Sequence, residues 1–223
     1  MSTSPQIIIG LYREGSTDKR FFTSLIQRTF QSVSFECRKE INIMDVIDID
    51  VDKTSYMDEV IAASRKGVLY FGISVLCIHA DADDSTDASV FNNKINPSLR
   101  KIEAEQDDIC KVIVPVVPVQ MTEAWMLADK MLLKNQIGTD KSDMELGFDK
   151  NPEQISDPKT VITGAIRIAS REKGKRHRND LNISVLYERL GENISLESLR
   201  QLPSFRKFED NVRNAFRELK YLN

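Results

Sequence analysis

Four short apolar runs, separated by stretches with helical spacing, constrain the fold of this chain more than any other feature. They cover residues 7–12, 41–49, 73–80 and 111–119. The first, third and fourth are nearly continuous in β-favouring residues, which is typical of strands buried on both faces. The second alternates more between polar and apolar residues, which places it nearer an edge. Strands that alternate with helices build parallel sheets. The sequence therefore predicts an α/β fold with a four-stranded, mainly parallel sheet flanked by helices.

The character of the chain changes after the fourth run. Helical patterns occur at 17–30, 57–66 and 88–106 between the strands, and then at 122–135, 159–172, 183–190 and 205–222. Residues 138–158 are polar, with Gly, Asp and Pro, and are expected to form a loop. We place a soft boundary near residue 137. The α/β domain covers 1–137, and a mostly helical C-terminal region covers 138–223 and packs on it.

Charge and cysteine content narrow the classes of function. The net charge of -3 gives no global basic field, so any nucleic-acid contact must come from a local patch. Cys37, Cys77 and Cys110 are widely spaced, without a CxxC pair, which indicates reduced thiols in a cytoplasmic protein. The opening residues lack the pattern of a signal peptide, and the longest apolar stretch, 68–80, is too short to span a membrane.

Acidic residues follow three of the four runs at the point where each predicted strand ends. Glu14 follows the first run, Asp81 and Asp83 follow the third, and Glu123 follows the fourth. The carboxyl ends of parallel strands meet at one edge of a sheet, where functional groups collect. Carboxylates held close together repel each other unless a cation or a proton lies between them, and hard oxygen ligands suit Mg²⁺ or Mn²⁺. The pattern therefore predicts a divalent-metal site.

Each acid also has a simpler interpretation. Glu14 precedes a predicted helix, and a carboxylate is favourable beside a helix N-terminus without binding anything. Asp81 and Asp83 could belong to a solvated acidic loop that caps the next helix. Glu123 could be a first-turn residue of a helix whose N-cap is Thr122. The convergence of three strand ends is what favours a metal site over these alternatives.

Positive charge is concentrated around residue 175. The basic residues of this segment include Arg167, Arg171, Lys173, Lys175, Arg176 and Arg178. Such a cluster can bind phosphates with an affinity that depends on salt, although a solvated face that balances the acidic residues explains it too. Arg13 and Lys19 flank Glu14 and are further candidates for contacts with a nucleic-acid phosphate.

At these positions the sequence resembles the Toprim family, the catalytic domain shared by topoisomerases, primases and OLD-type (overcoming lysogenisation defect) nucleases. The family pattern is Glu-Gly after the first strand and Asp-x-Asp after a later one, which here are Glu14-Gly15 and Asp81-Ala82-Asp83. The resemblance covers residues 6–120. The segments EGSTDKRFF, HADAD, TEAWMLAD and LPSFRKF are similar to small stand-alone Toprim-like proteins of bacteria, often suspected of acting in phage defence beside an ATPase.

The resemblance implies a Rossmann-like fold and a role for each acid. Glu14 would be a metal ligand or general acid/base, Asp81 and Asp83 would hold Mg²⁺ or Mn²⁺, and Glu123 would complete the coordination or hold a second ion. The implied reaction is cleavage of phosphodiester bonds in nucleic acid, with DNA as the expected substrate. The sequence has no GxxxxGK(S/T) motif, so an ATPase would be a separate partner protein. His79 departs from the apolar residue that is usual at its position.

Two other functions remain open at this stage, and so does the oligomeric state. The same fold could serve a non-catalytic protein that binds and regulates an ATPase or a nucleic acid. It could also support nucleotidyl or phosphoryl transfer to a small substrate, as in primase-like relatives.

Overall fold

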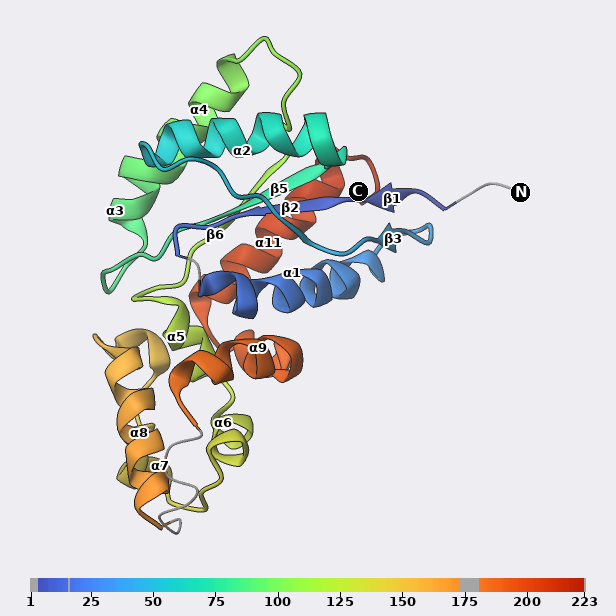
Figure 1. The fold of residues 1–223 in the computed structure, drawn as a ribbon. Helices are drawn as coiled ribbons and strands as arrows, with labels where there is room; N and C mark the ends of the chain where they lie inside the picture. The colour runs from blue at the N-terminus through green and yellow to red at the C-terminus, as the bar shows by residue number, and fades with distance from the viewer. Residues whose placement is uncertain (1–3, 16, 173–180, 223) are drawn as a thin grey trace.

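The computed structural model describes residues 4–15, 17–172 and 181–222 of the chain (Figure 1). Its central sheet has four strands in the order β4-β2-β5-β6, and every neighbouring pair is parallel. The strands are β2 (Ile9–Tyr12), β4 (Ile47–Asp48), β5 (Val75–His79) and β6 (Ile113–Val116). The predicted α/β fold with a four-stranded parallel sheet is therefore confirmed, and β4 lies at an edge of the sheet.

A second, two-stranded parallel sheet joins β1 (Gln6–Ile7) to β3 (Asn42–Ile43). The apolar run at 41–49, predicted as one strand, therefore forms two short ones. Its first part pairs with β1, and its second part pairs with β2 after the intervening residues 44–46. The prediction of a single strand there was wrong because the run has two different pairing partners.

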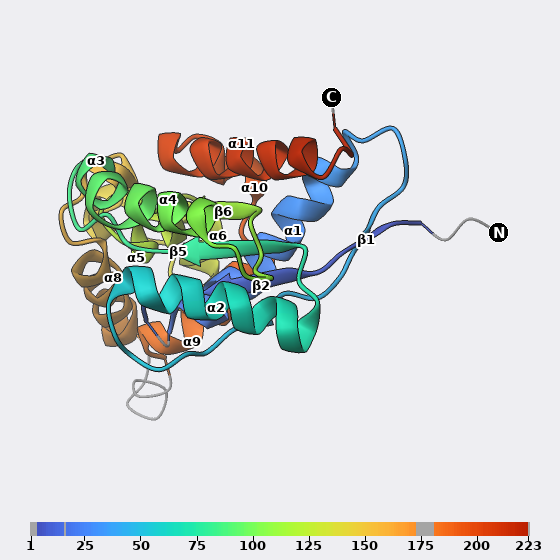
Figure 2. The ribbon, with the colours of Figure 1, turned by 90° about the horizontal axis from the view of Figure 1, so that it is seen from above.

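Alternate residues of the strands point to two separate cores. Leu11 and Cys77 belong to the core on one face of the sheet, whereas Leu76 and Ile78 belong to the core on the other. Helix α1 (Asp18–Ser34) covers the first face, and α2 (Tyr56–Phe71) covers the second (Figure 1). Figure 2 looks onto the second face, with α2 and α4 (Asn96–Ala104) lying over the strands.

The helical segment predicted at 88–106 is confirmed, with an irregular middle. It begins with α3 (Ala88–Val90), continues through a π-helical turn, η1 (Phe91–Ile95), and ends in α4. A π-helical turn inserts an extra residue into a helix and is frequently found at functional sites. This turn lies beside the acidic residues that follow β5.

The part of the chain after β6 contains more helices than the sequence predicted. They are α5 (Thr122–Met126), α6 (Lys130–Ile137), α7 (Asp143–Leu146), η2 (Pro152–Gln154), α8 (Pro158–Glu172), α9 (Ile183–Asn193), α10 (Leu196–Leu199) and α11 (Pro203–Glu218). The single helix predicted at 122–135 is two helices, because the Asp129 side chain caps α6 at the Leu132 N–H. The loop predicted at 138–158 contains α7, which a capping box between Ser142 and Glu145 stabilises.

The helices of this region do not form a separate layer. In Figure 1, α6, α7 and α8 lie below the sheet and α1, whereas α9 and α11 return to pack on α1. Helix α11 also packs on β6, and one apolar core runs from Leu11 through Phe30 to Phe216. The proposed boundary at residue 137 falls at the end of α6, and the core crosses it. Within the described part of the chain, every helix is too short or too polar to cross a lipid bilayer.

Candidate metal centre

The segment after β5 brings three acidic residues to one pocket. Beyond His79 the chain stays extended, because the N–H groups of Ala80 and Ala82 donate to the carbonyls of Val116, at the end of β6, and of Pro118, at 3.3 and 3.0 Å. Asp83 then adopts a left-handed conformation, with φ of 52°. This conformation is uncommon outside glycine and recurs at functional sites. The turn leaves Asp81, Asp83 and Asp84 lining a pocket of about 300 Å³.

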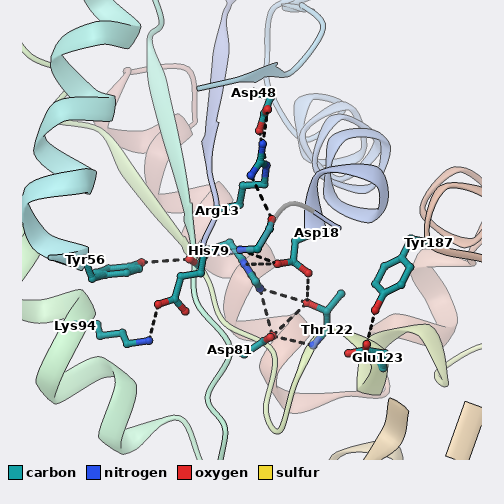
Figure 3. Close-up of polar contacts among 12 residues, drawn as sticks. Arg13, Asp18, Asp48, Tyr56, His79, Asp81, Lys94, Thr122, Glu123 and Tyr187 are labelled. Carbon is teal, nitrogen blue, oxygen red and sulfur yellow. Dashed lines mark hydrogen bonds and ion pairs between the residues drawn. The ribbon is translucent and has the colours of Figure 1, made fainter. Parts of the chain in front are cut away.

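A buried polar network holds Asp81 in place (Figure 3). Its Oδ1 atom accepts hydrogen bonds from the backbone N–H of Thr122 at 2.8 Å and from the Thr122 hydroxyl at 3.2 Å. His79 Nε2 lies 3.3 Å from the same oxygen. The Thr122 hydroxyl also lies 3.3 Å from Oδ1 of Asp18, the first residue of α1. Thr122 therefore links the end of β5 to the start of α1, and the helix N-cap is Met121 rather than Thr122.

Asp18 is an acid of this network that the sequence patterns did not single out. It is 8% exposed, and its Oδ2 accepts from the N–H of Gly15 at 3.1 Å, which fixes the turn after Glu14. Its position four residues after Glu14, in the first turn of a helix, reads as an ordinary helix-end carboxylate. Only the fold shows that Asp18 lies next to Thr122 and His79, far along the chain.

The pKa values show that these side chains share one electrostatic environment. Burial, together with the charges of Asp81 and Glu123, raises the pKa of Asp18, against the opposite effect of His79. Burial and the charges of Asp81 and Glu14 likewise raise the pKa of Asp83. Burial alone would lower the pKa of His79, but the neighbouring carboxylates outweigh it and raise that pKa. The centre thus holds more negative charge than it neutralises internally.

His79 lies at the base of the network and is fully buried. Its Nδ1 atom is 3.8 Å from Oδ2 of Asp18 and has no hydrogen-bond partner among the described residues. The ring packs on Phe22 with a centroid separation of 4.5 Å. His79 therefore occupies a strand position that is usually apolar and supplies a polar support beneath the carboxylates of Asp18 and Asp81.

Glu14 reaches the same region from the end of β2. Its Oε1 atom accepts a hydrogen bond from the ammonium group of Lys94 at 2.6 Å, and both side chains are 34% exposed. Lys94 belongs to η1 and lines the pocket with Asp81 and Asp83. Lys94 therefore lies between Glu14 and the Asp-x-Asp segment, and the predicted metal site at these acids stays a prediction.

Glu123 lies on the far side of Thr122, in the first turn of α5, and is 4% exposed. Its Oε1 atom accepts a short hydrogen bond from the Tyr187 hydroxyl and lies 3.4 Å from Nζ of Lys159. Burial and this hydrogen bond raise the pKa of Tyr187 far above its ordinary value, so the hydroxyl stays protonated and remains a donor. Glu123 is therefore tied to helices α8 and α9 of the C-terminal region.

The donor set fits Mg²⁺ or Mn²⁺ by its chemistry, because Asp81 and Asp83 offer carboxylate oxygens in one pocket and Glu14 offers another at Lys94, which lines that pocket. Within the described residues, no three acidic, histidine or cysteine side chains converge closely enough to enclose an ion as they stand. Binding would therefore require the exposed carboxylates to change rotamer. Glu14 would also have to leave Lys94.

The predicted phosphate contacts fall into two groups. Arg13 donates two hydrogen bonds to Asp48 on β4, at 2.8 and 2.9 Å, and Lys19 lies 3.3 Å from the same carboxylate. Both basic side chains therefore pair with Asp48, beside the turn between β2 and α1. Lys173, Lys175, Arg176 and Arg178 lie outside the described residues. Lys94 and Lys159 are the basic residues that the structure places beside the acids and that the sequence reading missed.

The contact between Tyr187 and Glu123 gives a first testable prediction. Replacing Tyr187 by phenylalanine is expected to lower the free energy of unfolding by about 1–3 kcal/mol, because a buried carboxylate loses a hydrogen-bond donor. Urea unfolding followed by circular dichroism measures the change. Tyr70→Phe is the matched control, since Tyr70 is 70% exposed and its replacement should alter stability by less than about 0.5 kcal/mol. Equal unfolding midpoints for the two variants would contradict the prediction.

Comparison with known proteins places these residues in a family. A family model described as "Domain of unknown function (DUF4276)" matches residues 13–213, a range that contains Glu14, the Asp-x-Asp segment, Glu123 and Tyr187. Searches of curated proteins and of solved structures each gave no match. The chain belongs to the family described as domain of unknown function DUF4276.

Proposed function

We propose that this protein is a Mg²⁺- or Mn²⁺-dependent nuclease that hydrolyses phosphodiester bonds in nucleic acid, with DNA as its substrate. The observation that carries the proposal is that Glu14 and the pair Asp81 and Asp83 follow the carboxyl ends of two neighbouring strands, with Lys94 between them. The resemblance to the Toprim family supplies the type of reaction. The acids supply the chemistry, because a fold alone does not determine a function.

A divalent ion held by carboxylates polarises a phosphate oxygen and lowers the pKa of bound water. In this chain Asp81, Asp83 and Glu14 would hold the ion. Thr122 would keep the Asp81 carboxylate oriented through its N–H and hydroxyl donors, and His79 would support Asp81 from the buried side. These supporting contacts matter because residues behind metal ligands commonly change affinity or activity by about 10- to 100-fold.

A second ion would have its own acids in this site. Asp18 and Glu123 lie on the other side of Thr122, and Glu123 raises the pKa of Asp18, so their charges interact. Two ions that share a set of carboxylates can stabilise both the attacking and the leaving oxygen of a phosphodiester. Tyr187 and Lys159 would then position Glu123.

The second candidate function is a non-catalytic protein that binds a partner, such as a separate ATPase. A specific observation favours it: Glu14 and Glu123 are each already paired with a lysine, Lys94 and Lys159. Acids that are neutralised internally have less need of a metal ion. Calorimetric titration with Mn²⁺ separates the two functions, since a non-catalytic relative is expected to bind the ion weakly or not at all.

Plasmid cleavage tests the proposal directly. The purified protein is expected to cut plasmid DNA in Mn²⁺ and to stop when EDTA removes the ion. Glu14→Ala should slow cleavage by about 10- to 100-fold, because one carboxylate ligand is lost. Glu188→Ala is the control, since Glu188 is exposed on α9 and should leave the rate unchanged. An inactive wild type, or equal rates for wild type and Glu14→Ala, would refute nuclease activity at this site.

A further inference from the structure

The pocket beside the Asp-x-Asp segment has two chemically different sides. One side carries the carboxylates of Asp81, Asp83 and Asp84, and the other carries Ser89, Asn93 and Lys94. The first side offers oxygen ligands for a cation. The second offers a hydroxyl, an amide and an ammonium group, which are the donors that proteins use to bind phosphate oxygens. A pocket with both sides suits a metal ion together with an anion.

We propose that Ser89, Asn93 and Lys94 form the phosphate-binding side of this pocket, with Lys94 moving from Glu14 to the substrate phosphate when a metal ion binds. This inference rests on the proposed function and deepens it, because it names the residues that bind the anionic group of the substrate. It also predicts that Lys94 contacts the phosphate only after the metal ion has bound.

The backbone supports a specialised role for this segment. Ser89 and Asn93 lie one helical turn apart, and the Asn93 amide donates to the Ser89 hydroxyl at 3.2 Å, so the two polar groups are held together. Lys94 belongs to the π-helical turn η1, where the Asn96 N–H reaches back to the Phe91 carbonyl. The carbonyl of Lys94 accepts from the Ser98 hydroxyl at 2.8 Å, which ties the turn to α4. Such turns are uncommon in proteins and occur frequently at functional sites.

Lys94 interacts with two of the acids that would bind the metal ion, Glu14 and Asp83. Its Nζ atom lies 2.6 Å from Oε1 of Glu14 and 5.5 Å from the ring centre of Tyr56, and its charge also acts on Asp83. Figure 3 shows the side chain reaching from its helix toward the strand ends. A divalent ion bound by Glu14 would compete with this ammonium group for the Glu14 carboxylate.

A displaced ammonium group in this pocket is free to pair with another anion that enters it. The phosphate of a nucleic acid would lie between the metal ion on the acidic side and the donors on the opposite side. Lys94 would then exchange one oxygen partner for another without leaving the pocket. If this exchange occurs, replacing Lys94 should strengthen the binding of the metal ion and weaken the binding of the nucleic-acid phosphate.

The test uses Lys94→Met in the full-length protein. Calorimetry with Mn²⁺ alone should give a dissociation constant about fivefold lower than that of the wild type, because Glu14 is released from a partly exposed ion pair. Cleavage of a fluorescently labelled single-stranded DNA oligonucleotide at saturating Mn²⁺ should show a KM about 10- to 100-fold higher, because a charged donor to phosphate is lost. If Lys94 had only a structural role, its replacement would weaken the binding of both Mn²⁺ and DNA.

Lys101→Met is the matched control, because Lys101 lies on α4, pairs with Glu105 at 3.2 Å and does not line the pocket. It should leave both constants unchanged. Weaker or unchanged Mn²⁺ binding in Lys94→Met, or an unchanged KM, would overturn the inference while the wild type still cleaves DNA. A wild type that neither binds Mn²⁺ nor cuts DNA overturns the proposed function instead, and the two failures are thereby distinguished.

Discussion

Asp81→Asn is expected to lower the rate of Mn²⁺-dependent DNA cleavage by about 100- to 1,000-fold, the largest loss among single substitutions in the site. Asp81 lines the pocket and is held firmly, since Thr122 and His79 both contact its Oδ1 atom. Asparagine keeps the shape and an oxygen that can accept from Thr122, but it removes the negative charge that a metal ion needs. Plasmid cleavage rates and calorimetric titration with Mn²⁺ measure the effect.

Asp107→Asn is the matched control for this substitution. Asp107 is an exposed carboxylate that pairs with Arg65 at 2.6 Å. It precedes β6 and so lies toward the amino ends of the parallel strands, whereas Asp81 follows a carboxyl end. Its replacement is expected to leave both measurements unchanged, and circular dichroism should show that both variants are folded. Wild-type cleavage and wild-type Mn²⁺ affinity in Asp81→Asn would exclude Asp81 from the metal site.

The second large effect concerns stability. Gly191→Ala is expected to lower the free energy of unfolding by about 1–3 kcal/mol. Gly191 lies on α9 where this helix packs closely on α1, and an added Cβ atom would come within 2.9 Å of the Cα atom of Phe21. Replacing glycine inside a helix normally stabilises it by about 1 kcal/mol. Here the obstacle is backbone, which cannot rotate away as a side chain can, so the clash outweighs the helix propensity.

Gly164→Ala provides a control of opposite sign. Gly164 lies within α8, and an added Cβ atom would meet nothing within 4 Å. Helix propensity then acts alone, and this variant should gain about 0.4–1 kcal/mol. Urea unfolding of the two variants and the wild type gives the comparison. A Gly191→Ala protein as stable as the wild type would show that α1 and α9 are not held in such close contact.

The sheet was predictable from sequence because its strands are buried on both faces. In β5 every residue is buried and all but His79 are apolar, so the strand appears in the sequence as a nearly continuous apolar run. The acids at the ends of β2 and β5 were predictable for a related reason, since each abrupt change from apolar to acidic residues marks a strand end. The division of 41–49 into two strands was not, because it depends on which neighbours β3 and β4 find.

The residues that contact these acids could not be predicted from the sequence, for a different reason. Lys94 and Glu14 are separated by 80 residues, and Asp18 and Thr122 by 104, so local spacing carries no information about either contact. Tyr187 was hidden in the same way, as one residue of an amphipathic helix whose docking on α1 decides its neighbours. The break between α5 and α6 depends on Asp129, whose carboxylate caps α6 and also accepts from the Ser195 N–H.

The last helix of the described chain packs directly on the first. Phe216 of α11 lies against Phe30 of α1 with ring centres 5.8 Å apart, and Asn211 donates to the carbonyl of Pro115 on β6. While the polypeptide is still being made, the apolar faces of α1 and the sheet therefore lack their cover until α11 has emerged from the ribosome. Packing of this core is completed only after α11 has been synthesised, and before then the apolar faces of α1 and β6 are exposed in the nascent protein.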